Sequence, residues 1–235
     1  MPKKAESKKN IIEFKNVSKT YEDGTKVLDD INLEIKEGEF VFIVGASGAG
    51  KTTLMKHIVR EEVPSEGEII VDGQELNKLK NWEFPELRKK VGFIYQDFKL
   101  LDSKTAFENV ALSLYVAGKS EEEINTIVPN LLHLVGLADK KDRFPKALSG
   151  GEKQRLAIAR ALAHEPKILL ADEATGNLDN ASSWVVVDLI KKINDWGTTI
   201  LFGTHNSDIV NTMKKRVVRI EKGQIIRDEK GAKYE

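Results

Sequence analysis

The sequence lacks three features, and each absence narrows its function. It has no cysteine, which excludes disulfide bonds and thiolate metal sites. It has no apolar run near the roughly 20 residues that a bilayer-spanning helix requires, so we expect no direct membrane insertion. Its 37 basic residues are balanced by 37 acidic residues. No global positive field therefore attracts nucleic acid, and we expect no nucleic-acid partner.

The two ends of the 235-residue chain differ in composition from the rest. Residues 1–10 carry four lysines but no apolar core, so they do not form a secretory signal, and we expect a disordered basic tail. Weak attraction to anionic lipid headgroups is the alternative for this segment. Residues 229–235 form a charged C-terminal tail. The stretch between the tails, 11–228, has the composition of one globular domain.

The spacing of apolar residues predicts alternating strands and helices. Residues 11–14 and 31–35 alternate apolar and polar side chains, as half-buried antiparallel strands do. Continuous apolar runs indicate buried strands at 40–44, 168–171 and 199–202. Helices are predicted at 51–60, 124–135, 152–164, 181–194 and 207–213, with Pro129 expected to kink or restart the second of them. Ser120-Glu121-Glu122-Glu123, just before that second helix, is a predicted capping box. This order predicts an α/β core with an antiparallel β subdomain and an inserted α-helical subdomain, approximately 97–162.

A phosphate-binding loop follows the buried strand 40–44. Residues 45–52 match the pattern G-x-x-x-x-G-K-[ST]. Glycines let backbone N–H groups turn toward phosphate oxygens, and the positive end of the next helix points at the same place. A glycine-rich turn with an accidental lysine is the alternative, but the strand before the loop and the helix after it disfavour that reading. The predicted ATP ligands are Gly45, Ser47, Gly48, Gly50, Lys51, Thr52 and Thr53, with the Thr52 hydroxyl also placed to bind Mg²⁺.

Two carboxylates end the apolar strand 168–171. Strand alternation sends Asp172 and Glu173 to opposite sides, so we expect them to have different roles. Asp172 would hold Mg²⁺, and Glu173 would orient or deprotonate the attacking water. An apolar strand that runs into a solvated loop would have a similar sequence. The phosphate loop upstream favours the catalytic interpretation.

The segment Ser149-Gly150-Gly151-Glu152 separates this chain from most P-loop ATPases. A hydroxyl, two glycines with accessible N–H groups and a helix N-terminus form a second phosphate-binding surface. A plain helix N-cap at Ser149 would explain the serine but not the double glycine. The segment resembles the signature motif of ATP-binding cassette (ABC) ATPases. That resemblance implies that Ser149 and Gly151 contact ATP held on the phosphate loop of a second subunit.

Four further positions match the same family in the same order. Tyr21 resembles the aromatic residue that stacks on adenine, and Gln96 resembles the Q-loop glutamine that senses the γ-phosphate and Mg²⁺. Asp179 resembles the D-loop aspartate, and His205 resembles the switch histidine. The resemblance implies a P-loop NTPase (RecA-like) core that hydrolyses ATP with Mg²⁺. It assigns catalysis to Lys51, Gln96, Glu173 and His205, and metal binding to Thr52, Gln96 and Asp172.

Two longer stretches narrow the resemblance. The run Thr175-Gly-Asn-Leu-Asp179 is typical of a subgroup that includes the FtsE, LolD and MacB ATPases, and the run Gln96-Asp-Phe-Lys-Leu-Leu101 looks most like the FtsE family of cell-division ATPases. This implies a homodimer that closes around ATP and drives an FtsX-like integral membrane partner, and so regulates cell-wall hydrolysis. The chain would be cytoplasmic and peripheral to the inner face of the plasma membrane. The alternatives are a LolD- or MacB-like exporter subunit and a soluble ABC ATPase that does not act in transport.

Two positions depart from the family pattern. Ala174 stands where the family usually has proline, which loosens the backbone after Glu173. Tyr95 replaces the commoner phenylalanine before Gln96. Neither change removes a catalytic group, so ATP hydrolysis remains the prediction.

The Q-loop also contains three apolar residues, Phe98, Leu100 and Leu101. By resemblance to the family, this is where a membrane partner docks. The alternative is that the three side chains pack against the helical subdomain. The sequence does not separate these two interpretations.

Overall fold

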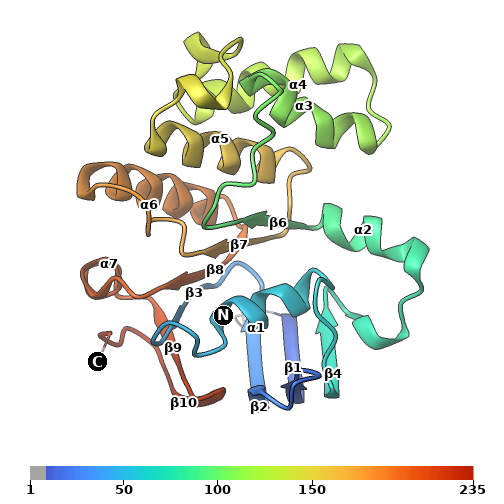
Figure 1. Ribbon diagram of the computed structural model, residues 1–235, viewed down its shortest axis with the longest axis vertical. Helices are drawn as coiled ribbons and strands as arrows, with labels where there is room; N and C mark the ends of the chain where they lie inside the picture. Colours follow the sequence, from blue (N-terminus) through green and yellow to red (C-terminus); the bar gives the residue numbers. More distant parts are fainter. Residues whose placement is uncertain (1–8, 235) are drawn as a thin grey trace, which may run out of the picture.

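The computed structural model describes residues 9–234, which form two β-sheets and the helices that pack against them (Figure 1). One sheet is antiparallel and has the order β2-β1-β4-β5. Its strands are β1 (Asn10–Thr20), β2 (Lys26–Lys36), β4 (Glu66–Val71) and β5 (Gln74–Glu75). β1 and β2 extend beyond the predicted ranges because their hydrogen bonds continue through polar positions that carry no apolar signal. Of the predicted basic tail 1–10, residues 1–8 lie outside the described residues, and β1 already begins at Asn10.

The second sheet is mostly parallel and has the order β10-β9-β3-β8-β7-β6. Its strands are β3 (Phe40–Val44), β6 (Val91–Ile94), β7 (Ile168–Asp172), β8 (Thr199–Thr204), β9 (Arg216–Glu221) and β10 (Gln224–Glu229). Every residue of β3, β7 and β8 is buried, as expected for parallel strands covered on both faces. Because β3, β8, β7 and β6 are parallel, their carboxyl ends share one edge of the sheet. The predicted site residues follow at this edge.

Helices cover both faces of the parallel sheet. They are α1 (Lys51–Ile58), α2 (Phe84–Lys89), α3 (Ala106–Val116), α4 (Glu121–Leu134), α5 (Gly150–Leu162), α6 (Asn180–Asp195) and α7 (Ser207–Met213). Short 3₁₀ turns lie at Leu76–Lys78, Asn81–Glu83, Ala138–Lys140 and Pro145–Ala147. In Figure 1, α3, α4 and α5 lie together beyond α6, on the side away from the antiparallel sheet. None of these helices is both long and apolar enough to cross a bilayer.

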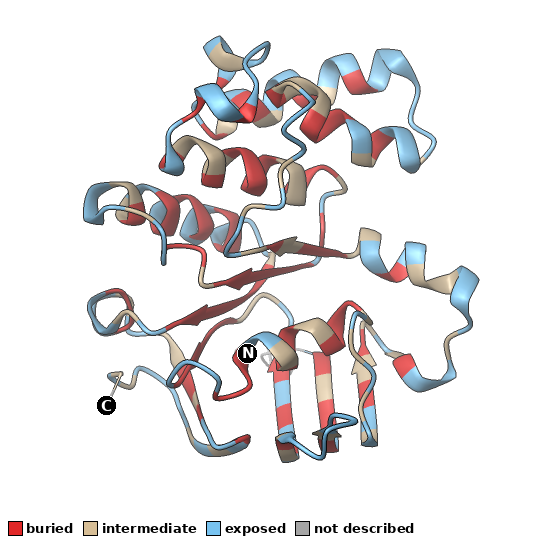
Figure 2. Cartoon of the chain, viewed as in Figure 1, coloured by how far each residue is buried: buried red, intermediate tan, exposed pale blue. Residues whose placement is uncertain are grey.

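Side-chain alternation along β3 supplies two separate hydrophobic cores. Phe42 and its neighbours at positions 40 and 44 pack into one core with α3 to α6, while Val41 and Ile43 enter the other with α1 and the antiparallel sheet. Figure 2 shows the buried residues concentrated on the sheets and on the helix faces that meet them. The phosphate loop that follows β3 is therefore anchored in both cores.

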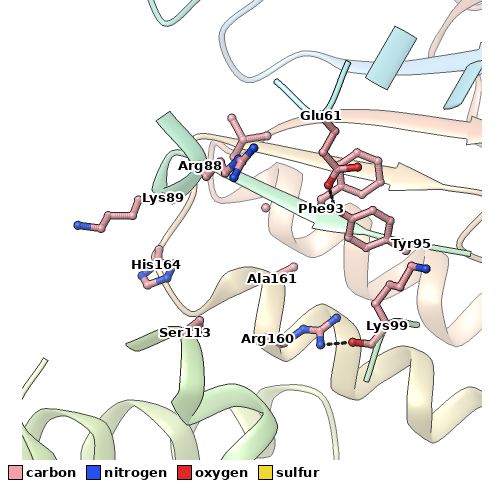
Figure 3. A pocket seen from close by; sticks show the side chains of 12 residues that line it. Glu61, Arg88, Lys89, Phe93, Tyr95, Lys99, Ser113, Arg160, Ala161 and His164 are labelled. Carbon is pink, nitrogen blue, oxygen red and sulfur yellow. Dashed lines mark hydrogen bonds between the residues drawn. The ribbon is translucent and has the colours of Figure 1, made fainter. Parts of the chain in front are cut away.

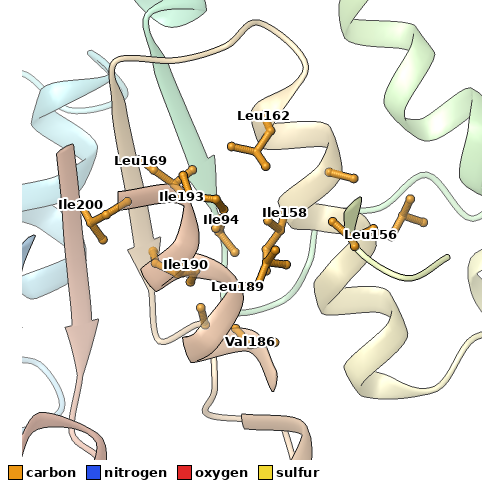
Figure 4. Packing of buried hydrophobic residues seen from close by; sticks show 14 of the residues in the cluster. Ile94, Leu156, Ile158, Leu162, Leu169, Val186, Leu189, Ile190, Ile193 and Ile200 are labelled. Carbon is orange, nitrogen blue, oxygen red and sulfur yellow. The ribbon is translucent and has the colours of Figure 1, made fainter. Parts of the chain in front are cut away.

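The contact between α5 and α6 joins the helical layer to the sheet. The buried residues of α6 recur at helical spacing on one face, and they meet α5 and β7 side chains (Figure 4). Those labelled in Figure 4 include Ile158, Leu162, Leu169, Val186, Ile190 and Ile193. This packing fixes the N-terminus of α5, and with it the signature segment, relative to the sheet.

Two local features of α4 test predictions made from the sequence: its capping box and Pro129. Ser120 accepts a hydrogen bond from the N–H of Glu123, whose carboxylate accepts from the N–H of Ser120, so the capping box is confirmed. Pro129 was expected to kink or restart this helix, but α4 runs through it as one helix. Its buried residues, Ile124, Val128 and Leu132, hold the helix on α3 and α5 and offset the hydrogen bond that proline removes.

The predicted charged tail 229–235 packs back onto the domain over the residues that are described. β10 ends at Glu229. The N–H of Tyr234 then donates to Oδ1 of Asn211 on α7 at 2.8 Å, and Arg227 donates to the Tyr234 carbonyl at 3.1 Å. Tyr234 also contacts the core that contains α7.

Candidate active site

The candidate site lies where four parallel strands end. Gly45 follows β3, Gln96 follows β6 by one residue, Glu173 follows β7 and His205 follows β8. A pocket of ≈ 340 Å³ at this edge brings Gln96, Glu173 and His205 together with the start of α1, while Gly45 does not line it. Of the predicted residues, Ser47, Gly48, Gly50, Lys51, Thr52, Thr53, Gln96, Glu173 and His205 line it.

The phosphate loop folds as its glycines require. Gly45 has a φ of 152°, and a Cβ there would lie 2.3 Å from the carbonyl oxygen of Ile220. Gly50 has a φ of 108° and directly precedes α1, with no side chain capping the first N–H groups of the helix. Those N–H groups and the positive end of α1 therefore face the pocket and favour an anion.

Lys51 lies at the base of the loop and is 6% exposed. Its ammonium group donates to the carbonyl oxygens of Gly45 at 2.9 Å and Ala46 at 3.1 Å. It also lies 3.3 Å from Oε1 of Glu173. The lysine is thus held in the pocket by its own loop, in reach of an anion placed there.

Asp172 and Thr52 meet although 120 positions separate them. The Thr52 hydroxyl donates to Oδ2 of Asp172 at 2.7 Å, while Oδ1 is buried and has no hydrogen-bond partner. Burial raises the pKa of Asp172. The hydrogen bond from Thr52 lowers this pKa, but the neighbouring Glu173 charge raises it further. A buried carboxylate oxygen without a partner, beside a hydroxyl, is a hard oxygen donor set that fits Mg²⁺. The described residues contain no group of three or more His, Cys, Asp or Glu side chains that could hold a metal ion by themselves.

Glu173 leaves the strand in a left-handed conformation, with a φ of 49°. Its N–H donates to the Gly203 carbonyl on β8 at 3.0 Å. The two carboxylates are therefore separated by a backbone reversal at Glu173, and not by the strand alternation that we predicted, because β7 ends at Asp172. A non-glycine residue held in this region carries local strain, which is typical of functional positions.

His205 stands on the other side of Glu173 from Lys51. Its Nδ1 lies 2.9 Å from Oε2 of Glu173, without the alignment of a hydrogen bond. The imidazole is mostly exposed to the pocket, whereas Glu173 is almost buried. One carboxylate oxygen thus faces a lysine and the other faces a histidine, as a group that handles protons or orients water requires.

Gln96 joins this set from the far end of the pocket. Its carbonyl accepts a hydrogen bond from Nδ2 of Asn177 at 3.1 Å, which ties the Q-loop to the segment after β7. Gln96 also lines an adjoining hollow of ≈ 480 Å³ together with Thr52 and Asp172. The three predicted metal ligands therefore share one space.

The signature segment lies away from this pocket. The Ser149 hydroxyl accepts from the N–H of Glu152 and caps α5, so α5 begins at Gly150, two residues before the predicted start. A Cβ at Gly151 would meet Oγ of Ser182 at 2.9 Å. Ser149 therefore does act as an N-cap. The cap does not explain the two glycines, for which the structure shows only the close approach of Gly151 to α6. Ser149 and Gly151 do not line the phosphate-loop pocket of their own chain.

Two predicted ATP contacts are not brought into the pocket. The Tyr21 hydroxyl donates to Oε1 of Glu62 at 3.2 Å, and the Lys19 ammonium lies 5.0 Å from the Tyr21 ring centre. Asp179 caps α6 by accepting from Ser182, which lowers the pKa of that carboxyl. Adenine stacking by Tyr21 and an ATP contact by Asp179 stay predictions.

Sequence reasoning missed two groups at the site. Val27 on β2 lines the pocket, and a Cβ at Gly50 would lie 2.9 Å from the Val27 carbonyl oxygen. Tyr95, before Gln96, hydrogen-bonds to Glu61 at the end of α1. No spacing rule predicts these contacts, because the two partners in each of them come from separate elements.

A second hollow region, here called the lateral groove, lies beside β6 between α2, α3 and α5. It consists of two adjoining pockets of ≈ 520 and ≈ 620 Å³ that share Arg88, Lys89, Ser113, Arg160 and His164. Figure 3 shows the residues that line the first of the two. Exposed apolar residues continue it along α3, with Leu112 43% and Val116 81% exposed. The groove therefore combines an apolar floor with cationic side chains.

Of the three apolar Q-loop residues, one packs against the helical subdomain and another is exposed on the predicted docking side. Leu100 packs against the core of the helical layer, whereas Leu101 is exposed and lines the lateral groove. Phe98 and Lys99 have φ values of 60° and 49°, and Arg160 on α5 donates to both of their carbonyls. The loop is thus shaped by α5, and it presents Leu101 to the groove.

The fold and the site define the class: a phosphate loop between β3 and α1 with a carboxylate pair after β7 makes this chain a P-loop NTPase. Residues 28–176 match the family model described as ABC transporter. The cell division ATP-binding protein FtsE of Bacillus subtilis is 49% identical over 224 residues, which covers 95% of this chain and 98% of that protein. The chain belongs to the ABC transporter family of ATPases, and the predicted resemblance to FtsE is confirmed.

Two other comparisons bear on the same point. The methionine import ATP-binding protein MetN of Vibrio vulnificus is 47% identical over 225 residues, but the match covers 94% of this chain and 65% of that protein. The dimeric, post-hydrolysis structure of the ATP-binding cassette MJ0796 bound to ADP and Pi has a TM-score of 0.86 at 38% identity, and covers 94% of this chain and 99% of that chain. The P-loop NTPase fold and the ATPase activity predicted from the motifs are confirmed.

Proposed function

We propose that this chain is the ATP-hydrolysing subunit of a membrane complex, in which two copies close around two ATP molecules and drive an FtsX-like integral membrane partner. The observation that carries the chemical part is the convergence of Lys51, Glu173 and His205 on one pocket at the phosphate loop. Asp172 is joined to this pocket through its hydrogen bond with Thr52. The partner assignment is supported by FtsE relatives that match nearly the whole chain.

Each side chain of the pocket has a distinct role in this proposal. Lys51 and the N–H groups at the start of α1 bind the phosphates. Thr52, Asp172 and Gln96 would hold Mg²⁺, which neutralises phosphate charge when it is bound. Glu173 orients and deprotonates water, and His205 keeps the Glu173 carboxylate in place and contacts the γ-phosphate.

Dimerisation follows from where the signature segment lies. Ser149 and Gly151 are outside the phosphate-loop pocket of their own chain, so a phosphate contact by them requires a second copy. The α5 N-terminus offers N–H groups and a positive dipole for that contact. The dimeric ADP and Pi complex of the similar cassette MJ0796 supports this arrangement. Loss of the γ-phosphate would then release the two halves.

The membrane partner would dock in the lateral groove. Leu101, Leu112 and Val116 offer apolar contact, and Arg88 and Lys89 offer positive charge beside it. A cytoplasmic segment with apolar and acidic side chains would complement this surface. The chain would thus be peripheral to the inner face of the plasma membrane, with ATP-driven motion passed to cell-wall hydrolases outside.

Glu173→Gln tests the chemical part of this proposal. The change removes the base but keeps the size of the side chain, so we expect ATP hydrolysis to fall roughly a hundredfold or more while ATP is still bound. The ATP-bound dimer should then accumulate, as measured by light scattering after gel filtration. Glu221→Gln, on an exposed β9 residue, is the control. A Glu173→Gln protein that turns over like wild type, or stays monomeric in saturating ATP, contradicts the proposal.

Depletion of the chain in its source cells tests the biological part. An FtsE-like role predicts a division defect with normal release of lipoproteins. The opposite pattern would favour the LolD-like exporter, and neither pattern would favour an ATPase without a membrane partner.

A further inference from the structure

The Q-loop is tied to the phosphate-loop helix by a hydrogen bond that the motif comparison did not predict. The Tyr95 hydroxyl donates to Oε1 of Glu61, and Figure 3 shows the two side chains directed toward one another. Tyr95 occupies a position where the family commonly has phenylalanine, which has no hydroxyl. The bond is therefore a property of this chain, and not of the family motif.

Glu61 is rigidly attached to α1. Arg60 has a φ of 57°, the Glu61 N–H donates to the Lys56 carbonyl at 2.9 Å, and the Arg60 N–H donates to the His57 carbonyl at 3.1 Å. These two bonds form a Schellman motif at the C-terminal end of the helix. Since α1 begins at Lys51, directly after the phosphate loop, Glu61 moves with that loop.

Tyr95 is held at the other end of the bond by β6. Its ring stacks on Phe93, with centroids 4.1 Å apart and planes inclined by 15°. Burial raises the pKa of the Tyr95 hydroxyl, and the hydrogen bond with Glu61 adds to this, so the phenol stays protonated and donates. The next residue is Gln96, whose carbonyl is bound by Asn177.

The pair also stands between two hollows. Glu61 and Tyr95 line the lateral groove, and they line the ≈ 480 Å³ hollow that contains Thr52, Gln96 and Asp172. A change at this pair therefore reaches the proposed metal ligands on one side and the proposed docking surface on the other.

We propose that Tyr95 is a positioning residue for ATP hydrolysis, because its hydroxyl, through Glu61, fixes Gln96 relative to the phosphate loop. The bond connects one rigid unit, the phosphate loop with α1 and Glu61, to a second unit, β6 with Tyr95 and Gln96. Without it, α1 and the Q-loop move independently, and Gln96 spends less time where Thr52 and Asp172 bind metal. The inference rests on the proposed ATP site and is independent of the identity of the partner.

Tyr95→Phe removes one oxygen and keeps the ring stack, so it tests the hydroxyl alone. We expect kcat to fall roughly three- to tenfold, in line with the net loss of one ordinary hydrogen bond at a partly exposed position. The Mg²⁺ concentration for half-maximal activity should rise, while KM for ATP stays unchanged because the phosphate-loop contacts are intact. Tyr115→Phe removes the same atom from an exposed tyrosine on α3 and should leave all three values at wild type.

A double-mutant cycle separates positioning from general loss of stability. Glu61→Ala should reproduce the Tyr95→Phe effect, and the double variant should lose no more than either single variant. Glu61→Gln keeps an acceptor oxygen and should restore most of the activity. Wild-type kcat and Mg²⁺ dependence in Tyr95→Phe would overturn the inference, as would additive losses or an equal rise in KM. A wild-type protein without ATPase activity would instead reject the proposed function.

Discussion

The ammonium group of Lys51 lies 3.3 Å from Oε1 of Glu173, so the phosphate loop and the residue that follows β7 are joined by an almost buried ion pair. Both side chains are little exposed, at 6% and 11%. The carbonyls of Gly45 and Ala46 also accept from the ammonium group. Glu173 is thereby held next to the place where phosphate would bind.

Lys51→Met should remove this ion pair and most ATP binding. The side chain keeps its length but loses its charge, so we expect the Kd for ATP to rise roughly ten- to a hundredfold, which corresponds to the loss of about 1.4–2.8 kcal/mol. Binding of a fluorescent ATP analogue measures it. Lys191→Met, at an exposed position of α6, is the control. Unchanged affinity in Lys51→Met would contradict the assignment of this pocket to phosphate.

Asp172→Asn should stabilise the nucleotide-free protein while it impairs metal use. Burial raises the folded-state pKa of Asp172, so this carboxyl stays protonated up to a higher pH in the folded state than in the unfolded state. Stability from this group is therefore complete below the unfolded pKa and falls as the pH rises through the folded pKa. Asparagine removes that loss, so we expect Tm at neutral pH to rise and Mg²⁺-dependent activity to drop.

Thermal unfolding over a pH series checks this prediction. The gain in Tm should shrink toward acidic pH, where Asp172 is protonated in both states. Asp188→Asn, on the exposed face of α6, should change neither Tm nor Mg²⁺ dependence. A lower Tm for Asp172→Asn at neutral pH would show that the carboxylate stabilises the fold and is not held there for metal.

Ser149→Ala should affect both stability and activity, whereas Ser120→Ala should affect only stability. Each serine closes a capping box, on α5 and on α4, so each change should cost about 1 kcal/mol of unfolding free energy. Only Ser149 lies on the proposed phosphate-binding surface of the second subunit. Urea unfolding and steady-state ATPase assays compare the two variants. Equal ATPase activity in both would exclude a role for Ser149 beyond capping.

Val116→Ala combined with Leu101→Ala should weaken capture of the membrane partner without changing ATP hydrolysis by the isolated chain. Both side chains are exposed on the lateral groove and make no contact with the ATP pocket. Co-purification with the co-expressed partner measures the effect. Val185→Ala, an exposed valine on α6, is the control. Full recovery of the partner by the double variant would place docking elsewhere.

Much of the site could be predicted because its motifs are local. The phosphate loop is a strand, a glycine turn and a helix within residues 40–58, and each part follows from neighbouring residues. The capping box at Ser120 is equally local and was correct. Pro129 was expected to kink or restart the helix, and the restart was wrong, since the packing of α4 against α3 and α5 outweighs the missing hydrogen bond.

The sequence by itself determined the phosphate loop, the order of the motifs and thereby the family. Only the tertiary structure decided which groups meet. The order β3-β8-β7-β6 brings Thr52 to Asp172 across 120 positions, and the left-handed turn at Glu173 directs its carboxylate to Lys51 and His205. The same packing joins Tyr95 to Glu61. Local spacing encodes turns and caps, but contacts between distant segments depend on the order of the strands and the packing of two cores, which no short motif contains.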